Sequence, residues 1–567
     1  MTATALISPA HGGTAKGDTA TSVLTVENLR VTFGDTEVVK GISFQVAPGR
    51  CLAIVGESGS GKSVTARTLV GLTGDGATVT ADTLELRTED SGAVDLGGRN
   101  ERSWRKIRGR DIGFVLQDAL VSLDQLRRTG DEVAEPLKAH GWGGRTERRA
   151  KAVELLGSVG VPEPEVKARQ RPYELSGGLR QRALIASAIA LDPPLLITDE
   201  PTTALDVTVQ AQILDLLSEA KSTGQAIILI SHDLSVVARL ADDIAVMRHG
   251  EIVEQGSAAR VLTAPQHEYT RALLDAVPST HTRGTRLVRR SGTDTVVGRR
   301  ARVVDHDRVV LEARGLKKVF CGPDRVDRTV VNDVSFRLFA GETLGIVGES
   351  GSGKTTTARI ALALEEATAG DVLLHGRAWS SLSVGKRRPY RREIGVVYQD
   401  PLSSFDPRWT VGRIVSDALT TGPRPPADAD AARTRTVELL EQVGLSANHY
   451  DAAPLRLSGG QRQRVAIARA LAPEPGILVC DEPVSALDVS IQAQVLDLLT
   501  DLQDELGVSY LFISHDLGVI HHMSDRVLVM KDGEVVEAGT ADDVFDSPRH
   551  PYTRDLLTAL PRLEVAR

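Results

Sequence analysis

The chain has 567 residues, 41% of them hydrophobic and 25% charged, and a formal net charge of −8. This length exceeds what a single hydrophobic core supports, and the composition is that of a folded globular protein. The negative charge argues against a nucleic-acid binder, because proteins neutralise phosphates with a basic face.

Residues 1–22 are rich in Thr, Ala, Gly and Ser and lack the apolar core of a signal peptide, so we expect a disordered tail there. No stretch of the chain reaches the roughly 18 apolar residues that a membrane span needs. Cys51, Cys321 and Cys480 have neither metal-clip nor short-disulfide spacing, which indicates a reducing compartment. The sequence therefore predicts a cytosolic protein, and other subunits would have to supply any membrane-spanning helices.

One sequence pattern occurs twice in the chain. The string IVGESGSGK occupies 54–62 and 346–354, and ISHDL occupies 230–234 and 513–517. Such self-similarity indicates a tandem duplication. We expect four parts: a tail at 1–22, a first domain with a C-terminal extension at 23–280, a basic linker at 281–307, and a second domain with a C-terminal extension at 308–567.

Apolar runs in both copies predict the fold class. CLAIVG at 51–56 and TLGIVG at 343–348 lead into Gly-rich loops, and later apolar runs alternate with helical patterns. Continuous apolar strands between helices are typical of a buried, largely parallel sheet with crossover helices. The sequence therefore predicts two α/β domains.

The Gly-rich loops fit the pattern G-x-x-x-x-G-K-[ST], and each lies between a strand and a helix. Glycines let backbone N–H groups surround phosphate oxygens, and the helix N-terminus favours an anion. The lysines would reach the β- and γ-phosphates of ATP, and the final hydroxyls would bind Mg²⁺. The predicted ATP-binding residues are Gly56, Ser58, Gly59, Ser60, Gly61, Lys62, Ser63, Val64, Gly348, Ser350, Gly351, Ser352, Gly353, Lys354, Thr355 and Thr356.

Two later apolar strands end in adjacent acids, Asp199–Glu200 and Asp481–Glu482. Acids at the end of a buried strand are costly unless a cation or a polar ligand compensates them. We predict that Asp199 and Asp481 hold Mg²⁺, directly or through water. Glu200 and Glu482 would polarise the water that attacks ATP.

LSGGLRQR at 175–182 and LSGGQRQR at 457–464 resemble the signature sequence of ABC-type ATPases. The resemblance covers nearly all of the chain outside the tail and the linker. Ser176 precedes Asp199 by 23 residues, and Ser458 precedes Asp481 by the same number, as is typical of that family. The resemblance implies two P-loop NTPase domains, each with a RecA-like parallel-sheet core, an antiparallel β subdomain and a helical signature subdomain.

By the same resemblance, Gln117 and Gln399 are expected to sense the metal ion and the attacking water, and to contribute to the Mg²⁺ site. His232 and His515 are expected to contact the γ-phosphate. A lone histidine after an apolar strand is more often structural, but both copies carry S-H-D-L.

Two further residue pairs follow from the resemblance. Asp206 and Asp488 are expected to couple the two sites across the domain interface. Phe33 and Phe320, which lie 23 to 28 residues before the phosphate loops, are expected to stack on adenine. An aromatic residue at such a position could equally fill the core.

The family's mechanism implies that each signature helix points at the ATP bound by the other copy, in an intramolecular ATP sandwich. A tether between the copies favours such an arrangement by raising their effective concentration. Because both copies retain the glutamate and the histidine, we expect two competent sites. The first signature has Leu179 where the second has Gln461, and we expect at most a modest asymmetry from this. The signature residues are Ser176, Gly177, Gly178, Ser458, Gly459, Gly460 and Gln461.

HEYTRALLDAVP at 267–278 and HPYTRDLLTALP at 550–561 resemble the C-terminal extension of ATPases that serve dipeptide, oligopeptide, glutathione and nickel importers. The resemblance implies an ATP-hydrolysing subunit that binds two transmembrane permeases and works with an extracellular solute-binding protein. It would lie at the cytoplasmic face of a bacterial plasma membrane and bind no nucleic acid. Some relatives carry an iron–sulfur site in the extension, and we expect none here because no cysteine cluster follows either histidine.

Several alternatives stay open at this stage. The ATPase could serve a drug or antibiotic exporter, or act on the ribosome or DNA without transport. The first copy reads QDALVSLDQLRRTG at 117–130 and the second QDPLSSFDPRWTVG at 399–412, so the two copies could face non-identical permeases. The seven arginines of the linker at 281–307 could form a solvated tether or contact anionic lipid head groups.

Overall fold

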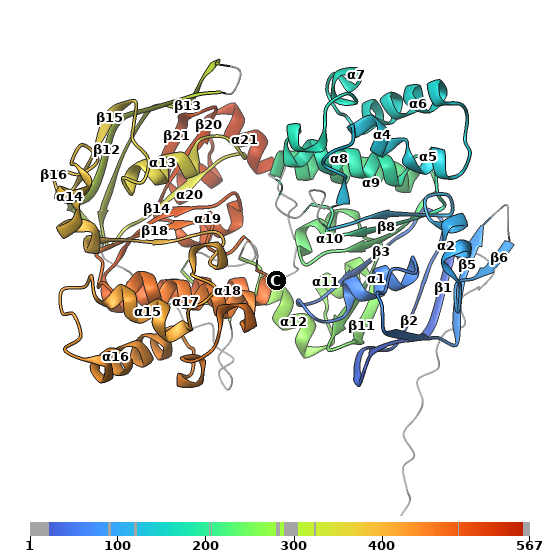
Figure 1. The fold of residues 1–567 in the computed structure, drawn as a ribbon, viewed down its shortest axis with the longest axis horizontal. Helices are drawn as coiled ribbons and strands as arrows, with labels where there is room; N and C mark the ends of the chain where they lie inside the picture. The colour runs from blue at the N-terminus through green and yellow to red at the C-terminus, as the bar shows by residue number, and fades with distance from the viewer. Residues whose placement is uncertain are drawn as a thin grey trace, which may run out of the picture.

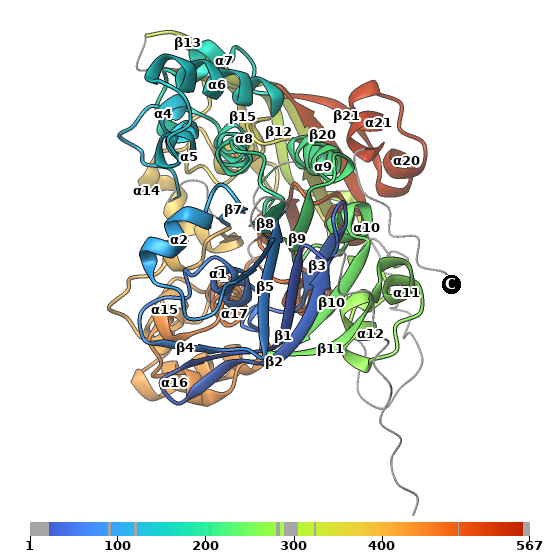
Figure 2. The ribbon, with the colours of Figure 1, turned by 90° about the vertical axis from the view of Figure 1, so that its right-hand side faces the viewer.

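Two α/β units lie side by side in the protein (Figure 1), and Figure 2 shows them from a perpendicular direction. We call residues 22–278 the first half and residues 304–558 the second half. The computed structural model describes residues 22–88, 92–117, 122–202, 205, 207–278, 284–288, 304–322, 325–485 and 487–558. Of the predicted tail, only Ser22 lies among the described residues.

The centre of the first half is a six-stranded sheet with the order β11-β10-β3-β9-β8-β7. Its strands are β3 (Cys51–Val55), β7 (Ile112–Val115), β8 (Leu195–Asp199), β9 (Ala226–Ile230), β10 (Asp243–Arg248) and β11 (Glu251–Ser257). All neighbours are parallel except β10 and β11. Every residue of β3, β8 and β9 is buried, as the continuous apolar runs predict.

An antiparallel sheet covers one face of this central sheet. Its strands are β1 (Leu24–Phe33), β2 (Thr36–Val46), β4 (Ala77–Thr80), β5 (Thr83–Thr88) and β6 (Gly92–Asp95). One hydrophobic cluster joins its side chains to β3, β8 and β9 and to α1 (Lys62–Leu69), the helix that follows the phosphate loop.

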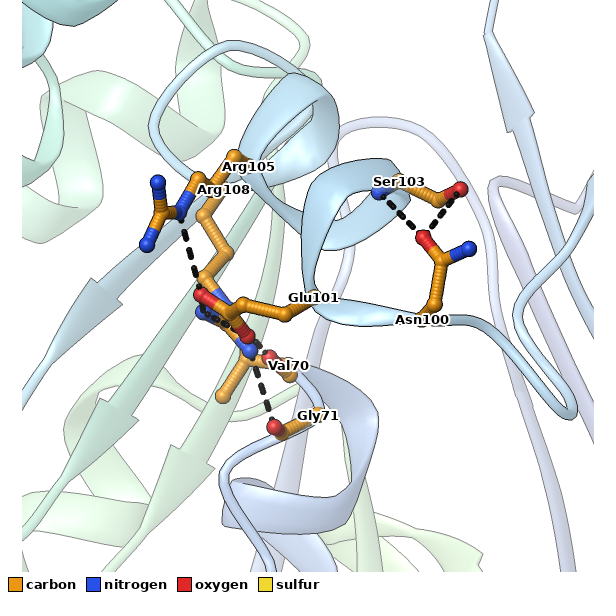
Figure 3. Close-up of polar contacts among 7 residues, drawn as sticks. All are labelled: Val70, Gly71, Asn100, Glu101, Ser103, Arg105 and Arg108. Carbon is orange, nitrogen blue, oxygen red and sulfur yellow. Dashed lines mark hydrogen bonds and ion pairs between the residues drawn. The ribbon is translucent and has the colours of Figure 1, made fainter.

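Helix α2 (Glu101–Ile107) is tied to the end of α1 (Figure 3). The Arg108 guanidinium donates to the carbonyls of Val70 and Gly71 over 2.7 and 2.8 Å and pairs with Glu101 over 2.9 Å. These contacts satisfy carbonyls at the C-terminal end of α1, where a helix has no internal partners for them. The helix behind the first phosphate loop is thus held at its C-terminal end.

Helices cover the other face of the central sheet, where a second hydrophobic cluster forms. They are α4 (Thr129–Val133), α5 (Glu135–Ala139), α6 (Arg145–Ser158), α7 (Pro164–Lys167), α8 (Gly177–Ala188), α9 (Val207–Ser222), α10 (Leu234–Leu240), α11 (Ala258–Thr263) and α12 (Glu268–Asp275). Cys51, Ala53 and Val55 of β3 belong to this cluster, whereas Leu52 and Ile54 belong to the other. The alternation follows from the two-residue period of a strand.

The second half repeats this plan with the sheet order β17-β18-β19-β14-β20-β21 and the antiparallel order β13-β12-β15-β16. Its strands are β12 (Asp305–Cys321), β13 (Asp327–Ala340), β14 (Thr343–Val347), β15 (Ala369–Leu374), β16 (Arg377–Ala378), β17 (Ile394–Val397), β18 (Ile477–Asp481), β19 (Ser509–Ile513), β20 (Arg526–Lys531) and β21 (Glu534–Thr540). Its helices are α13 (Lys354–Ala361), α14 (Val384–Arg387), α15 (Val411–Leu419), α16 (Ala429–Gln442), α17 (Gly459–Leu471), α18 (Val489–Leu506), α19 (Leu517–Met523), α20 (Ala541–Asp546) and α21 (Pro551–Thr558).

The two halves meet along a seam. Helix α12 of the first half packs against α18 of the second (Figure 1). Val207 and Ala276 from the first half are buried in the main hydrophobic cluster of the second. Apolar contacts therefore hold the halves together in addition to the covalent link.

A short part of the predicted linker, residues 284–288, lies on α18. Leu287 is 2% exposed and belongs to the hydrophobic cluster of the second half. The backbone N–H groups of Leu287 and Val288 donate to the Asp497 carboxylate over 3.2 and 3.0 Å, and Arg286 pairs with Asp501 over 2.5 Å. We call residues 284–288 the anchored segment. Among the described residues, no helix is both long and apolar enough to cross a membrane.

Candidate active site

The loop between β3 and α1 turns sharply where only glycine fits. Gly56 has a φ of 151°, and a Cβ at this position would lie 2.1 Å from the carbonyl oxygen of Met247. Gly348 has a φ of 157°, and its Cβ would lie 2.1 Å from the carbonyl oxygen of Met530. A Cβ so close to a backbone oxygen would clash, so both loops require their first glycine.

Each loop lysine bends back into its own loop. The Lys62 ammonium donates to the carbonyls of Gly56 and Glu57 over 2.7 and 2.8 Å. Lys354 makes the same two bonds to its own loop, each at 2.7 Å. Burial lowers the pKa of Lys62, and the nearby carboxylates, Glu200 first among them, oppose that shift. A phosphate would be a stronger partner for these buried cations than neutral carbonyls are.

The hydroxyl that ends each loop contacts the first acid of the acidic pair. Ser63 donates to Asp199 over 3.0 Å, and Thr355 donates to Asp481 over 3.2 Å. Asp199 is fully buried, and its Oδ2 has no hydrogen-bond partner among the described residues. Burial raises the pKa of Asp199, although the bond from Ser63 opposes the shift. A buried carboxylate oxygen beside a hydroxyl suits Mg²⁺, which pays for the burial of the charge.

Among the described residues, no group of three or more His, Cys, Asp or Glu side chains could hold a metal ion alone. Each half offers one hydroxyl beside one carboxylate, which fits Mg²⁺, an ion that commonly takes one or two protein oxygens and completes its shell with phosphates and water. The residues present therefore fit the predicted ion in each half.

Each second acid contacts two side chains, a glutamine and a histidine. Glu200 has a φ of 50° and Glu482 a φ of 48°, a left-handed conformation that non-glycine residues seldom adopt and that often marks functional sites. In the first half, Gln117 Nε2 donates to Glu200 Oε2 over 2.8 Å, and His232 Nδ1 lies 3.1 Å from Glu200 Oε1.

The second half has the same arrangement. Gln399 Nε2 donates to Glu482 Oε2 over 2.9 Å, and His515 Nδ1 lies 3.1 Å from the same oxygen. Burial alone would lower the pKa of His515, but the hydrogen bond and charge of Glu482 outweigh it and raise the pKa. The pKa of Glu482 falls because the contacts of His515 outweigh its own burial. In each half the structure thus brings together the glutamate, the glutamine and the histidine that the sequence singled out.

Two contacts cross the seam from one phosphate loop to the other half. The Ser490 hydroxyl at the start of α18 donates to Glu57 Oε1, and the Thr208 hydroxyl in α9 donates to Glu349 Oε1, both at 2.5 Å. Asp488 caps α18 by accepting from the N–H of Ile491 over 3.2 Å, and its charge contributes to the field at Lys62. Asp206 lies outside the described residues.

Comparison with known proteins places this geometry in a family. A family model described as "ABC transporter" matches residues 39–203 and 331–485, which make up more than half of the chain. The chain belongs to this family. A second model, for the C-terminal region of oligopeptide/dipeptide transporters, matches residues 253–301 and 536–567.

Curated relatives of this ABC ATPase match over almost their whole length. A glutathione import ATP-binding protein of Escherichia coli (strain K12) is 43% identical, with 97% of this chain and 91% of the relative covered. The corresponding protein of Salmonella typhimurium is 42% identical, with 96% and 90% covered. A solved dimeric ATP-binding cassette with bound ADP and phosphate is 31% identical over 41% of this chain and 98% of its own, with a TM-score of 0.38.

These matches confirm the α/β class, the tandem duplication and the resemblance to ABC-type ATPases. Members of this family bind ATP and are ATPases coupled to transport, so the chain is an enzyme of that kind.

The signature helices of the ABC ATPase begin with different caps. Ser176 accepts from the N–H of Leu179 over 3.4 Å, and Ser458 accepts from the N–H of Gln461 over 3.3 Å. Gln461 also accepts from the N–H of Ser458 over 3.0 Å, which completes a capping box. The Leu179 side chain has no oxygen that could accept from the N–H of Ser176. This missing bond is a physical cause for the expected asymmetry between the two signatures. The glycines Gly177, Gly178, Gly459 and Gly460 form the first turns of α8 and α17.

The two predicted adenine-stacking residues have different surroundings. Phe33 is partly buried against the cluster under the antiparallel sheet. Phe320 is 40% exposed, and the Lys318 ammonium lies 4.8 Å from the centre of its ring. An exposed ring is available for stacking, whereas the surroundings of Phe33 also accommodate the core-filling alternative.

Sequence reasoning missed two tyrosines and the loop glutamates. The N–H of Glu57 donates to the Tyr269 hydroxyl over 3.0 Å, and the N–H of Glu349 donates to the Tyr552 hydroxyl over 3.1 Å. Both tyrosines lie in the C-terminal extensions, in the strings H-E-Y-T-R and H-P-Y-T-R. The repetition of Glu and Tyr in both copies is the signal that could have found them.

Proposed function

We propose that the chain is the ATP-hydrolysing subunit of a bacterial importer for dipeptides, oligopeptides or a related small solute such as glutathione or a nickel chelate. The match of both extensions to the C-terminal region of oligopeptide/dipeptide transporters carries the proposal. The names of the curated relatives, which are glutathione import proteins, support it.

We infer roles for the residues around each glutamate. Glu200 and Glu482 accept the proton of the attacking water as its oxygen bonds to the γ-phosphorus and the bond to the bridging oxygen breaks. Gln117 and Gln399 hold the glutamate carboxylate through one contact, and His232 and His515 hold it through another.

The phosphate groups would take the place of the loop carbonyls as partners of Lys62 and Lys354. Mg²⁺ would be held by Ser63 and Asp199 in one half and by Thr355 and Asp481 in the other, and it would neutralise charge that develops on the phosphate oxygens.

We propose that the two halves close over two ATP molecules. One site combines the phosphate loop of the first half with Ser458, Gly459 and Gly460, and the other combines that of the second half with Ser176, Gly177 and Gly178. The reciprocal bonds of Ser490 and Thr208 to the opposite loops support this arrangement. Asp206 and Asp488, beside those bonds in the sequence, would couple the sites.

The partners are two permease subunits and an extracellular solute-binding protein, and the chain would lie at the cytoplasmic face of the plasma membrane. The permease surfaces would differ between the halves. Leu126 is 81% exposed in the first half, whereas the equivalent Arg408 is paired with Asp406 over 2.7 Å in the second. An exposed leucine in one half and an ion-paired arginine at the equivalent position of the other fit two non-identical permeases.

The experiment uses the complex with its permeases in liposomes. Glu200→Gln and Glu482→Gln, made separately, should each reduce both ATP turnover and uptake of the transported peptide by about a hundredfold or more, in line with the loss of a general base. Wild-type turnover in either variant would show that the altered site is not catalytic. Uptake of peptide that does not depend on ATP would refute the proposal as a whole.

A further inference from the structure

The glutamate in the second position of each phosphate loop joins three parts of the molecule. The Glu57 carbonyl accepts from Lys62, its N–H donates to Tyr269 of the C-terminal extension, and its carboxylate accepts from Ser490 of the second half. The three contacts measure 2.8, 3.0 and 2.5 Å. A single loop residue is thus bound by its own half on two sides and by the opposite half on the third.

The second copy makes the same three contacts. The Glu349 carbonyl accepts from Lys354 over 2.7 Å, its N–H donates to Tyr552 over 3.1 Å, and its carboxylate accepts from Thr208 over 2.5 Å. The hydroxyl residue differs between the copies, Ser in one direction and Thr in the other, but the hydroxyl is present in both. The repetition argues for a requirement for the hydroxyl rather than an accident of packing.

Each tyrosine is held rigidly by its own extension. Tyr269 is 6% exposed, its ring lies 4.8 Å from the Arg248 guanidinium, and its N–H donates to His267 over 3.1 Å. The Glu254 carboxylate accepts from the N–H groups of Gln266 and His267 over 2.9 and 3.0 Å and so fixes the start of α12.

The corresponding carboxylate in the second half is Glu537, which accepts from the N–H groups of Arg549 and His550 over 2.7 and 3.1 Å. Tyr552 is 7% exposed, and the Lys531 ammonium lies 4.7 Å from its ring. Burial, as the main cause, raises the pKa of Tyr269 to about 12, so its phenol keeps its proton at any physiological pH. A neutral, fixed hydroxyl is suited to hold one backbone N–H in place.

We propose that Tyr269 and Tyr552 are positioning residues that fix the phosphate loops so that Glu57 and Glu349 reach the opposite half. The hydrogen-bond chain from tyrosine through loop glutamate to the opposite hydroxyl couples nucleotide binding at one site to the state of the other half. The inference rests on the proposed ATP binding at these loops. It adds the C-terminal extension to the residues that couple ATP binding in one half to the other half.

The loop lysine makes this hydrogen-bond chain respond to bound nucleotide. In the structure, Lys62 supports the Glu57 carbonyl from inside the loop. When phosphate takes over the ammonium, that support is lost. The tyrosine still holds the N–H of Glu57 and the opposite hydroxyl its carboxylate, while the carbonyl keeps the weaker bond from the N–H of Ser60 over 3.2 Å. The hydrogen-bond chain therefore matters most for the position of the loop in the nucleotide-bound state. Loss of one of its bonds should weaken nucleotide binding and coupling between the sites, and should not lower the stability of the fold.

Tyr269→Phe tests the inference in the full chain, because it removes the hydroxyl but keeps the ring over Arg248. Removal of one hydrogen bond to a backbone N–H should raise the KM for MgATP about two- to tenfold and lower the Hill coefficient of ATP hydrolysis toward 1. Tyr552→Phe should do the same. A matched control is Tyr510→Phe, which deletes a buried phenol hydroxyl bonded to the Leu499 carbonyl over 2.7 Å, away from both loops. It should leave KM and the Hill coefficient unchanged.

Substitutions at the opposite hydroxyl supply the second test. Ser490→Ala should raise KM as Tyr269→Phe does, whereas Ser490→Thr should match wild type, because Thr208 already fills this role in the other direction. The double variant Tyr269→Phe with Ser490→Ala should be little worse than either single variant, since both break one chain.

Additive effects of the two substitutions, or unchanged KM and Hill coefficient in both tyrosine variants, would overturn the inference while leaving ATP binding intact. Failure of the wild-type chain to bind MgATP would instead overturn the proposed function itself. The two results are distinguished by the wild-type measurement alone.

Discussion

Asp497 and Asp215 hold equivalent positions in the two copies, and we predict that their removal has very different effects on stability. Both follow the string Q-A-Q-x-L in α18 and α9. Asp497 is 5% exposed and accepts two backbone N–H groups of the anchored segment. The Asp215 side chain is 70% exposed and pairs with Arg239 over 2.6 Å. One carboxylate holds a chain segment in place, and the other forms a surface ion pair.

The magnitudes follow from these surroundings. Asp497→Ala removes two hydrogen bonds to a charged acceptor and leaves two N–H groups unpaired, but it also relieves the burial of the charge, so we expect a net loss of about 2 to 3 kcal/mol. Asp215→Ala should cost about 0 to 1 kcal/mol, as exposed ion pairs do. Leu287→Ala, which empties a buried site in the same segment, should cost about 2 to 3 kcal/mol.

Urea unfolding of the full chain measures the losses of stability. Limited trypsin digestion of the folded chain, in a separate experiment, measures release of the anchored segment. Release of the anchored segment should speed cleavage after Arg286 in Asp497→Ala and in Leu287→Ala, but not in Asp215→Ala. Equal loss of stability in Asp497→Ala and Asp215→Ala, or unchanged cleavage after Arg286 in the former, would refute the reasoning.

Three further predictions concern the sites. Leu179→Gln should complete the missing capping box and stabilise the first signature helix by about 0.5 to 1 kcal/mol, measurable as a higher Tm. Gly56→Ala should abolish MgATP binding at one site without unfolding the chain, because its Cβ would meet the Met247 carbonyl; two intact sites by equilibrium dialysis would contradict this. The raised pKa of His515 predicts stability that is fully present below the ordinary histidine value of about 6.5 and is lost as the pH rises through the folded value, so the Tm difference between wild type and His515→Gln should shrink at alkaline pH.

The sequence alone predicts those parts of the candidate site that lie in short contiguous motifs. The phosphate loops, the acids at the ends of β8 and β18 and the histidines after β9 and β19 each follow directly from a strand that ends at the same edge of a parallel sheet. Their meeting is a consequence of that topology, which the apolar runs already predict. The roles of Gln117 and His232 beside Glu200, by contrast, were expected from the family resemblance.

The seam could not be predicted in the same way. Glu57 and Tyr269 are 212 residues apart in the chain, and Glu57 and Ser490 are 433 apart. No local pattern indicates which hydroxyl or carboxylate a residue meets at such a distance. Asp497 and Asp215 illustrate this most directly. They follow nearly identical strings, yet Asp497 is buried in a contact of the second half and Asp215 is exposed on the surface of the first.

The anchored segment also limits how the halves can separate. Residue 278 ends the described part of the first half and residue 284 begins the anchored segment, so six peptide steps connect them. Fully extended, those steps span at most about 20 Å. This length is an upper limit on how far residue 278 of the first half can move from the anchored segment. A movement of the halves beyond that limit would have to pull Leu287 and Val288 away from Asp497.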